Sequence, residues 1–276
     1  MKTSESYLKY FEKIEKNIAD SLEIPPQNFV KEDYHKLRVG IKKLNAFLIS
    51  LEYCLKSFKK DPYFKPLKNL FRQAGKIRDY QLEDSTIKRN DSHLIQHYLS
   101  DLEKRIQKEK VKFASLHHKT NAEKIKKVLK KVKPFIKKIN RKDLHQFVES
   151  ERNKIRHFFQ TDPLVPANLH MMRKLLKIDF YTRKITDHPI AENMAEEENN
   201  FLELLGKWHD GRTVNDLLEK SILKGKAGVG ECDNLLKIKA EIKSTSEHLL
   251  NDIKERIVKG IYLWQPSQQT RLQVSF

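Results

Sequence analysis

The sequence has few of the residues that interrupt helices, cross-link a chain or anchor it in a membrane. Only eight of its 276 residues are Gly and nine are Pro, which favours long helices over many short strands. Two cysteines, Cys54 and Cys232, allow at most one disulfide bond and lack metal-type spacing. Neither an apolar run of about 18 residues nor the apolar core of a signal peptide is found. We therefore expect an all-α, soluble, cytoplasmic protein that does not insert into membranes.

Acidic residues are also in short supply. The chain has 37 Asp and Glu against 55 Lys and Arg, which gives a formal net charge of +18. The excess is evenly divided, because residues 1–120 hold 25 basic and 16 acidic side chains and residues 121–276 hold 30 and 21. A disordered basic tail would concentrate the charge at one end. The even division therefore predicts a charged folded body with an acidic partner.

Two short motifs each occur twice, in the same order. The basic motif, His-x-x-Arg-x-x-x-Lys, covers His35–Lys42 and returns 135 residues later at His170–Lys177. A second motif, Gly-Lys-x-x-Asp, follows each copy at Gly75–Asp79 and Gly206–Asp210. The separations from His to Gly, 40 and 36 residues, differ by about one helical turn. Repetition of both motifs predicts an internal duplication whose repeated element is cationic.

Apolar periodicity predicts the same helical plan in both halves. The expected helices are 5–22, 32–57, 63–79 and 91–118, then 121–140, 142–160, 167–187, 191–209, 213–224 and 232–264. We predict two pseudo-symmetric antiparallel four-helix bundles, formed by residues 1–120 and 121–264. A polar C-terminal tail, residues 265–276, follows them, and together they form one domain.

The first basic motif is predicted to lie on one helix face, away from the core. An apolar seam runs along Leu37–Leu51, and His35, Arg38 and Lys42 project about 100° to 160° away from it. Like charges at these spacings repel each other, and an anion would offset the repulsion. Basic residues can simply solvate a helix face, but two copies in register favour an anion site. Because His gains charge as pH falls, we expect tighter binding near pH 6 than near pH 8.

The Gly-Lys-x-x-Asp motif has a structural interpretation as well. We expect Gly75 and Gly206 to permit close contact between helices. Asp79 and Asp210 are expected to cap or pair near the start of the next segment, because a capping-box pattern follows Asp210.

With these motifs the chain resembles the CHAD family, the conserved histidine α-helical domain. That family carries a His-x-x-Arg-x-x-x-Arg/Lys helix and a Gly-x-x-Arg-Asp-like motif in each of two halves, and the resemblance extends from about Leu8 to Trp264. It implies two helical bundles enclosing a basic channel or groove that binds inorganic polyphosphate without catalysis. It also implies an association with polyphosphate granules.

The candidate polyphosphate contacts combine this resemblance with the positions of the charges. They are His35, Arg38, Lys42, Lys43, Arg72, Lys76, Arg78, His170, Arg173, Lys174, Lys177, Lys207 and His209. Arg78 and His209 could equally pair with a neighbouring acid instead of lining the site.

The second half departs from the first at several positions. Asp179 and Arg183 stand where the first seam has Leu44 and Leu48. Either the second helix is rotated, or these two residues form a partly buried i,i+4 pair. Glu203 also aligns with Arg72, so we expect unequal halves and a weaker second site.

Nucleic acid is the alternative partner, because charge favours RNA or DNA as much as polyphosphate. The basic side of each motif, however, carries no aromatic residue on which a base could stack, and Tyr34 and Tyr181 lie near but outside it. We therefore rank RNA or DNA below polyphosphate.

Catalysis, metal binding and a cofactor are not expected. The one dense acidic group, Glu192, Glu196, Glu197, Glu198 and Glu203, lies early in a predicted helix, where carboxylates favour the positive end of the dipole. His93 and His97 have metal-ligand spacing but lack a third ligand nearby.

Overall fold

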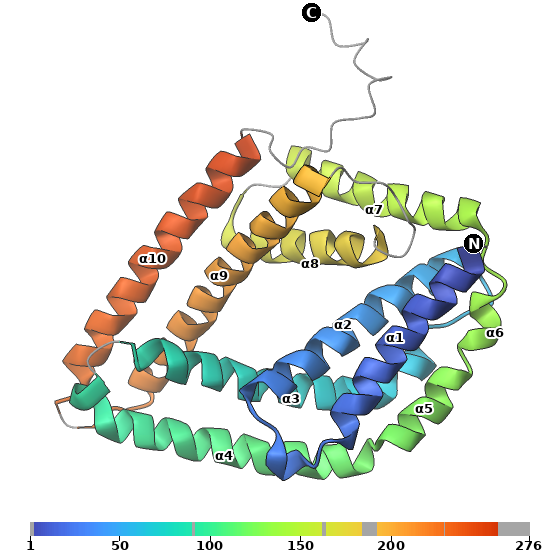
Figure 1. Ribbon diagram of the computed structural model, residues 1–276. Coiled ribbons are helices and arrows are strands. Elements are labelled where there is room, and N and C mark those ends of the chain that lie inside the picture. Colours follow the sequence, from blue (N-terminus) through green and yellow to red (C-terminus); the bar gives the residue numbers. More distant parts are fainter. Residues whose placement is uncertain (1–2, 90–91, 162–163, 184–191, 229, 259–276) are drawn as a thin grey trace, which may run out of the picture.

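The computed structural model describes residues 3–89, 92–161, 164–183, 192–228 and 230–258, and all regular structure within these ranges is helical (Figure 1). The prediction of an all-α fold is confirmed. The first half contains α1 (Thr3–Glu23), α2 (Lys31–Cys54), α3 (Asp61–Ile87) and α4 (Gln96–Lys119), with 3-10 turns at Pro26–Asn28 and Ser92–Ile95. Two short helices follow, α5 (Ala122–Lys130) and α6 (Lys133–Ile136). The second half contains α7 (Arg141–Thr161), α8 (Pro166–Arg183), α9 (Glu192–Leu223) and α10 (Cys232–Val258).

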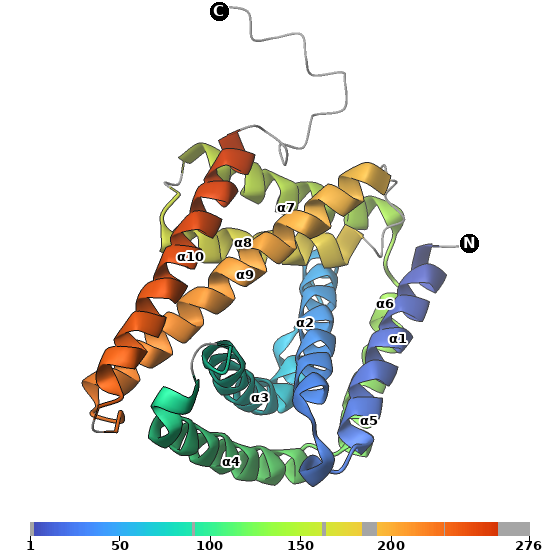
Figure 2. The same ribbon diagram turned by 60° about the vertical axis from the view of Figure 1, so that its left-hand side comes forward.

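Helices at equivalent places in the two halves have equivalent neighbours. Helix α2 packs against α1 and α3, and α3 packs against α4. In the second half α8 packs against α7 and α9, and α9 packs against α10. This order agrees with the predicted duplication. The inner helices also meet across the molecule, because α2 contacts α8 and α3 contacts α9 (Figure 2).

Apolar packing joins the two halves into one body. One cluster centres on α1, α2 and α3 and includes side chains of α5, α6 and the start of α7, such as Ile125 and Leu144. Another is formed by α7, α8, α9 and α10 around Trp208. In a third, Tyr98 and Leu102 of α4 pack with Leu218 of α9 and with α10. Apolar packing therefore crosses residue 120, where we placed the boundary between bundles.

Three predicted helix boundaries are wrong. Helix α3 continues to Ile87 instead of ending at Asp79, and α9 runs without a break from Glu192 to Leu223. The segment 121–140 forms two short helices rather than one. In α9 the helix continues through Gly211 because its neighbours Trp208 and Val214 are buried, and packing outweighs a local stop signal. A methyl group at Gly211 would lie 2.6 Å from Ser246 Oγ, so this glycine permits the approach of α10.

Some expectations fall outside the described residues, namely the helical stretches 184–187 and 259–264 and the tail 265–276. Across the part of the chain that is described, every helix is either too short or too polar to cross a lipid bilayer.

Candidate functional site

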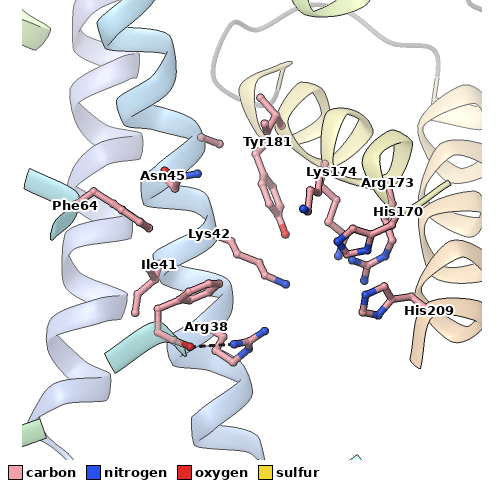
Figure 3. A pocket seen from close by; sticks show the side chains of 14 residues that line it. Arg38, Ile41, Lys42, Asn45, Phe64, His170, Arg173, Lys174, Tyr181 and His209 are labelled. Carbon is pink, nitrogen blue, oxygen red and sulfur yellow. Dashed lines mark hydrogen bonds between the residues drawn. The ribbon is translucent and has the colours of Figure 1, made fainter. Parts of the chain in front are cut away.

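The two basic motifs share one cavity of about 370 Å³ between α2 and α8 (Figure 3). Its basic side chains are Arg38, Lys42, His170, Arg173, Lys174, Lys177 and His209. The remaining wall is formed by Ile41, Asn45, Ala46, Phe64, Phe71, Ile178 and Tyr181. Two helices whose motifs lie 135 residues apart in sequence thus direct their cations into the same space.

Arg38 is seated on α3 by the glycine of the second motif. Its Nη1 donates a hydrogen bond of 2.9 Å to the Phe71 carbonyl, and its guanidinium lies 4.6 Å from the centre of the Phe71 ring. A methyl group at Gly75 would lie only 2.2 Å from Arg38 Nη1. Gly75 therefore makes room for an arginine side chain. This is more specific than the close helix contact that we expected.

Arg173 lies beside Gly206 in the corresponding way but is held less closely. A methyl group at Gly206 would be 3.7 Å from Arg173 Nη2, which is an ordinary contact. Leu202 occupies the position equivalent to Phe71, so this arginine has no corresponding ring. Its Nε is buried and lacks a hydrogen-bond partner among the described residues. The second arginine is therefore held by fewer of the contacts that fix the first one.

Two lysines in the cavity have strongly lowered pKa values. Burial lowers the pKa of Lys42 to about 7, and the charges of Arg38 and Lys177 add to the effect. Burial likewise lowers the pKa of Lys177 to about 8, with a contribution from Arg173. In both cases the charged amine is disfavoured because it is partly desolvated and surrounded by other cations. An anion in the cavity would favour the charged amines and raise both pKa values.

The two motif histidines have different surroundings. Burial, followed by the charges of Lys174 and His209, lowers the pKa of His170 to about 4. Its ring stacks on that of His209, with 4.8 Å between centroids. His35 lines another cleft, and its pKa is also lowered, by burial and by Arg78. His170 is therefore neutral at pH 6 in the ligand-free protein.

Asp79 and Asp210 lie close to the cations instead of capping helices. Both α3 and α9 continue past them, so of the two predicted roles, capping or pairing, the capping role is wrong. Burial raises the pKa of Asp79, although Arg38 opposes this. Burial would also raise the pKa of Asp210, but His209 and nearby arginines lower it overall. The recurrence of Asp at the same place in both motifs was the sequence signal for this pair of counter-charges.

Of the two residues that could either line the site or pair with an acid, His209 does both, whereas Arg78 acts on the site only through its charge. His209 lines the cavity, and its Nδ1 lies 3.7 Å from Asp210 Oδ1. Arg78 does not line the cavity, but its charge lowers the pKa values of Lys42 and Lys177 and acts on Asp210. Arg78 therefore contributes to the positive potential of the site.

Five other predicted contacts do not line this cavity. His35 and Lys43 line a cleft of about 450 Å³ between α1 and α2, together with Asp20 and Asp33. Three exposed side chains, Arg72, Lys76 and Lys207, do not line the cavity. Periodicity alone could not separate these cations from the cavity set, because the direction of the neighbouring helices decides which side of each helix faces it.

Aromatic side chains line the cavity, which corrects our expectation. Phe64 and Phe71 come from α3, outside the basic motifs, and Tyr181 lies one helical turn beyond Lys177. The Tyr181 hydroxyl points into the cavity, and burial raises its pKa (Figure 3). Tyr34, by contrast, is buried in the core. The absence of a stacking surface therefore no longer argues against a ligand with bases.

Asp179 and Arg183, which replace the seam leucines in the second basic helix, form the buried i,i+4 pair that was one of the two alternatives. Arg183 Nε lies 2.5 Å from Asp179 Oδ2, both side chains are buried, and Arg183 Nη2 also contacts the Glu198 carboxylate. Helix α8 still directs Arg173 and Lys177 into the cavity. Among the residues with described positions, no group of three or more His, Cys, Asp or Glu is arranged to hold a metal ion.

Comparisons with known proteins agree on one family. The model of the CHAD domain family matches residues 10–219. The crystal structure of the CHAD domain from the plant Ricinus communis is 13% identical, with a TM-score of 0.71 over 94% of this chain and 92% of that one. PptA from Streptomyces chartreusis is 12% identical, with a TM-score of 0.68 over 92% and 99%. At these identities the structural likeness shows the fold alone, and a search of curated proteins found no match. Because the family model spans most of its length, the chain belongs to the CHAD domain family.

Proposed function

We propose that this protein binds inorganic polyphosphate in the cavity between α2 and α8, without catalysis. The observation that supports this is the convergence of both basic motifs on one cavity, with Arg38 and Lys42 on one side and Arg173 and Lys177 on the other. Successive phosphates of one chain can meet both sides. Arginine offers a planar pair of donors to phosphate oxygens, and lysine offers a mobile point charge.

The ligand-free cavity favours an anion on energetic grounds. Lys42 and Lys177 lose part of their charge near neutral pH because burial and neighbouring cations disfavour it. A bound polyanion would supply the missing counter-charge and raise both pKa values. The two carboxylates nearby, Asp79 and Asp210, are too few to neutralise the site, since Arg38, Arg78 and Arg173 already act on them.

The experiment that tests this proposal compares two double variants of equal charge. Lys42→Met with Lys177→Met removes both cavity lysines, whereas Lys76→Met with Lys207→Met removes the exposed lysines of the second motif. Affinity for long-chain polyphosphate is measured by calorimetry at fixed salt. We expect a loss of more than about 100-fold for the cavity pair, because each of the two charged hydrogen bonds contributes about 1.5–3 kcal/mol. The exposed pair should change the affinity by less than about threefold.

Equal losses in the two double variants would contradict a site in the cavity. The double variant of the cavity lysines should fold, because the substitutions remove two half-buried charges that repel their neighbours. Its melting temperature without ligand should therefore not fall below that of the unaltered protein. The non-catalytic part of the proposal has a separate test. Release of phosphate from polyphosphate in the presence of magnesium would overturn it.

Single-stranded RNA is the second candidate, because Phe64 and Tyr181 line the cavity and could stack with bases. Competition between long polyphosphate and RNA of equal charge, at fixed salt, separates the two. We expect polyphosphate to displace RNA. Half of the residues that line the cavity of about 370 Å³ are basic, and an unbranched chain of phosphates can bring more negative charge into this space than RNA can.

A further inference from the structure

The cavity has two chemically different ends. The basic side chains of α2 and α8 end at Lys42 and Lys177, and the next residues that line the cavity, Asn45 and Ala46 on α2 and Ile178 and Tyr181 on α8, are uncharged. Phe64 of α3 completes this end (Figure 3). We call these five residues the uncharged end of the cavity. It directly adjoins the cations, since Lys42 and Asn45 are three residues apart on one helix.

A bare phosphate chain does not use the uncharged end. Phosphate oxygens are strongly hydrated and gain nothing from contact with an aromatic ring or an aliphatic side chain. A cavity of about 370 Å³ lies within the usual range for small-molecule sites, which combine apolar walls with a few placed polar groups. The better complement to this cavity is a molecule with phosphates at one end and a flat apolar group at the other.

We propose that the cavity also binds a nucleoside polyphosphate, with its phosphates against Lys42, Arg173 and Lys177 and its base at the uncharged end. This inference rests on the proposed function, because the same cations hold the phosphates. It adds a second class of ligand, which the cavity distinguishes from inorganic polyphosphate by the base.

The side chains at the uncharged end suit a nucleobase. Arg38 covers the Phe71 ring, so Phe64 and Tyr181 are the aromatic walls that remain for stacking. Asn45 points into the cavity, and its amide carries both a donor and an acceptor for the edge of a base (Figure 3). The Tyr181 hydroxyl, which also points inward, adds a further donor.

The test compares ATP with inorganic tripolyphosphate, both without magnesium, by calorimetry on the full chain. The two ligands share three linked phosphates, and in ATP the nucleoside replaces one ionisable oxygen of a terminal phosphate, so any advantage of ATP must come from the nucleoside and not from charge. We expect ATP to bind about tenfold more tightly, which is the contribution of one stacked base. Phe64→Leu keeps an apolar side chain but removes the ring, so it should weaken ATP about tenfold and leave tripolyphosphate unchanged. Tyr53→Leu, an exposed aromatic of α2 outside the cavity, is the matched control and should change neither affinity.

Three results would overturn the inference. They are an ATP affinity no greater than that of tripolyphosphate, a Phe64→Leu variant that retains the preference for ATP, and a variant that loses both ligands equally while staying folded. If Phe64→Leu does not fold, Tyr181→Leu on the opposite wall serves as the test, with the same expectation. When tripolyphosphate and long polyphosphate bind but ATP has no advantage, only this inference fails. When none of the three binds, the proposed function fails as well.

Discussion

Helices α2 and α8 carry the same basic motif but seat its arginine differently. Arg38 donates to the Phe71 carbonyl, lies on the Phe71 ring and fills the space left by Gly75. Arg173 has Leu202 in place of the ring and lies at ordinary contact distance from Gly206. Both halves therefore have the arginine, but the contacts that hold its side chain against the neighbouring helix differ. The first arginine also joins α2 to α3, whereas the second lies against its neighbouring helix without an equivalent carbonyl and ring contact.

The core sides of the same two helices differ as well. Leu44 and Leu48 of α2 are buried among apolar side chains, whereas the equivalent Asp179 and Arg183 of α8 form a buried ion pair. Burial raises the pKa of Asp179 to about 7 despite the charge of Arg183. A repeat can thus replace a hydrocarbon layer by a polar one when each charge has a partner.

Removing Arg183 from the buried ion pair should have the largest effect on the stability of the protein. Arg183→Leu leaves the carboxylates of Asp179 and Glu198 without their shared guanidinium, and we expect a loss of about 3–5 kcal/mol in the free energy of unfolding. Urea denaturation measures this. The double variant Asp179→Leu with Arg183→Leu restores the apolar pattern of α2 and should be less destabilised than the single variant. A double variant that is equally destabilised would show that the pair cannot be exchanged for hydrocarbon.

Gly75→Ala should break the attachment of Arg38. The new methyl group would lie 2.2 Å from Nη1, so the side chain must leave the Phe71 carbonyl. The lost hydrogen bond and ring contact together contribute about 2–4 kcal/mol, and the better helix propensity of Ala returns about 1 kcal/mol. We expect a net destabilisation of about 1–3 kcal/mol in urea denaturation. Unchanged stability would mean that Arg38 relaxes without loss.

The pH dependence of binding should come from the lysines rather than the histidines. Between pH 6 and pH 8 the ligand-free protein loses protons from Lys42, with a pKa of about 7, and Lys177, with a pKa of about 8. Bound polyphosphate favours the charged amines, so binding takes up protons and weakens as pH rises, by roughly tenfold over this range.

Calorimetry at pH 8 in two buffers of different ionisation enthalpy measures the proton uptake, which we expect to be about one proton or more. Lys42→Met with Lys177→Met should remove most of it. His170→Gln should change it little, because the pKa of His170 is already about 4. Uptake that persists without the two lysines would contradict this assignment.

Gly206→Ala should have the smallest effect, and in the opposite direction to Gly75→Ala. At 3.7 Å from Arg173 Nη2 the methyl group fits, and replacing a glycine inside α9 should stabilise the protein by about 0.5–1 kcal/mol. Polyphosphate affinity should stay the same. If both glycine variants behave alike, the difference in seating between the two arginines has no energetic consequence.

Much of the plan was readable from sequence because it depends on local patterns. The seam Leu37–Leu51 predicted α2 and its buried side, and the repeated motifs predicted that Arg38, Lys42, Arg173 and Lys177 are contacts for an anion. The wrong predictions concern positions where tertiary packing outweighs the local conformational preference of the residues. Asp79 and Asp210 resembled helix caps, yet both helices continue because apolar side chains beyond them, such as Ile87 and Val214, are buried. The aromatic wall was missed because Phe64 and Phe71 come from a helix outside the basic motif.

The sequence by itself determined that the chain is helical and that each half carries a cationic helix face, because both properties follow from residue spacing along a helix of fixed geometry. Only the tertiary structure decided that α2 and α8 direct these faces into one cavity, and that Gly75 and Gly206 lie beside Arg38 and Arg173. The tertiary structure also decided that the pKa values of Lys42 and Lys177 are lowered. The physical reason is that burial and the repulsion between like charges depend on which helices meet, and contacts between residues far apart in sequence set that.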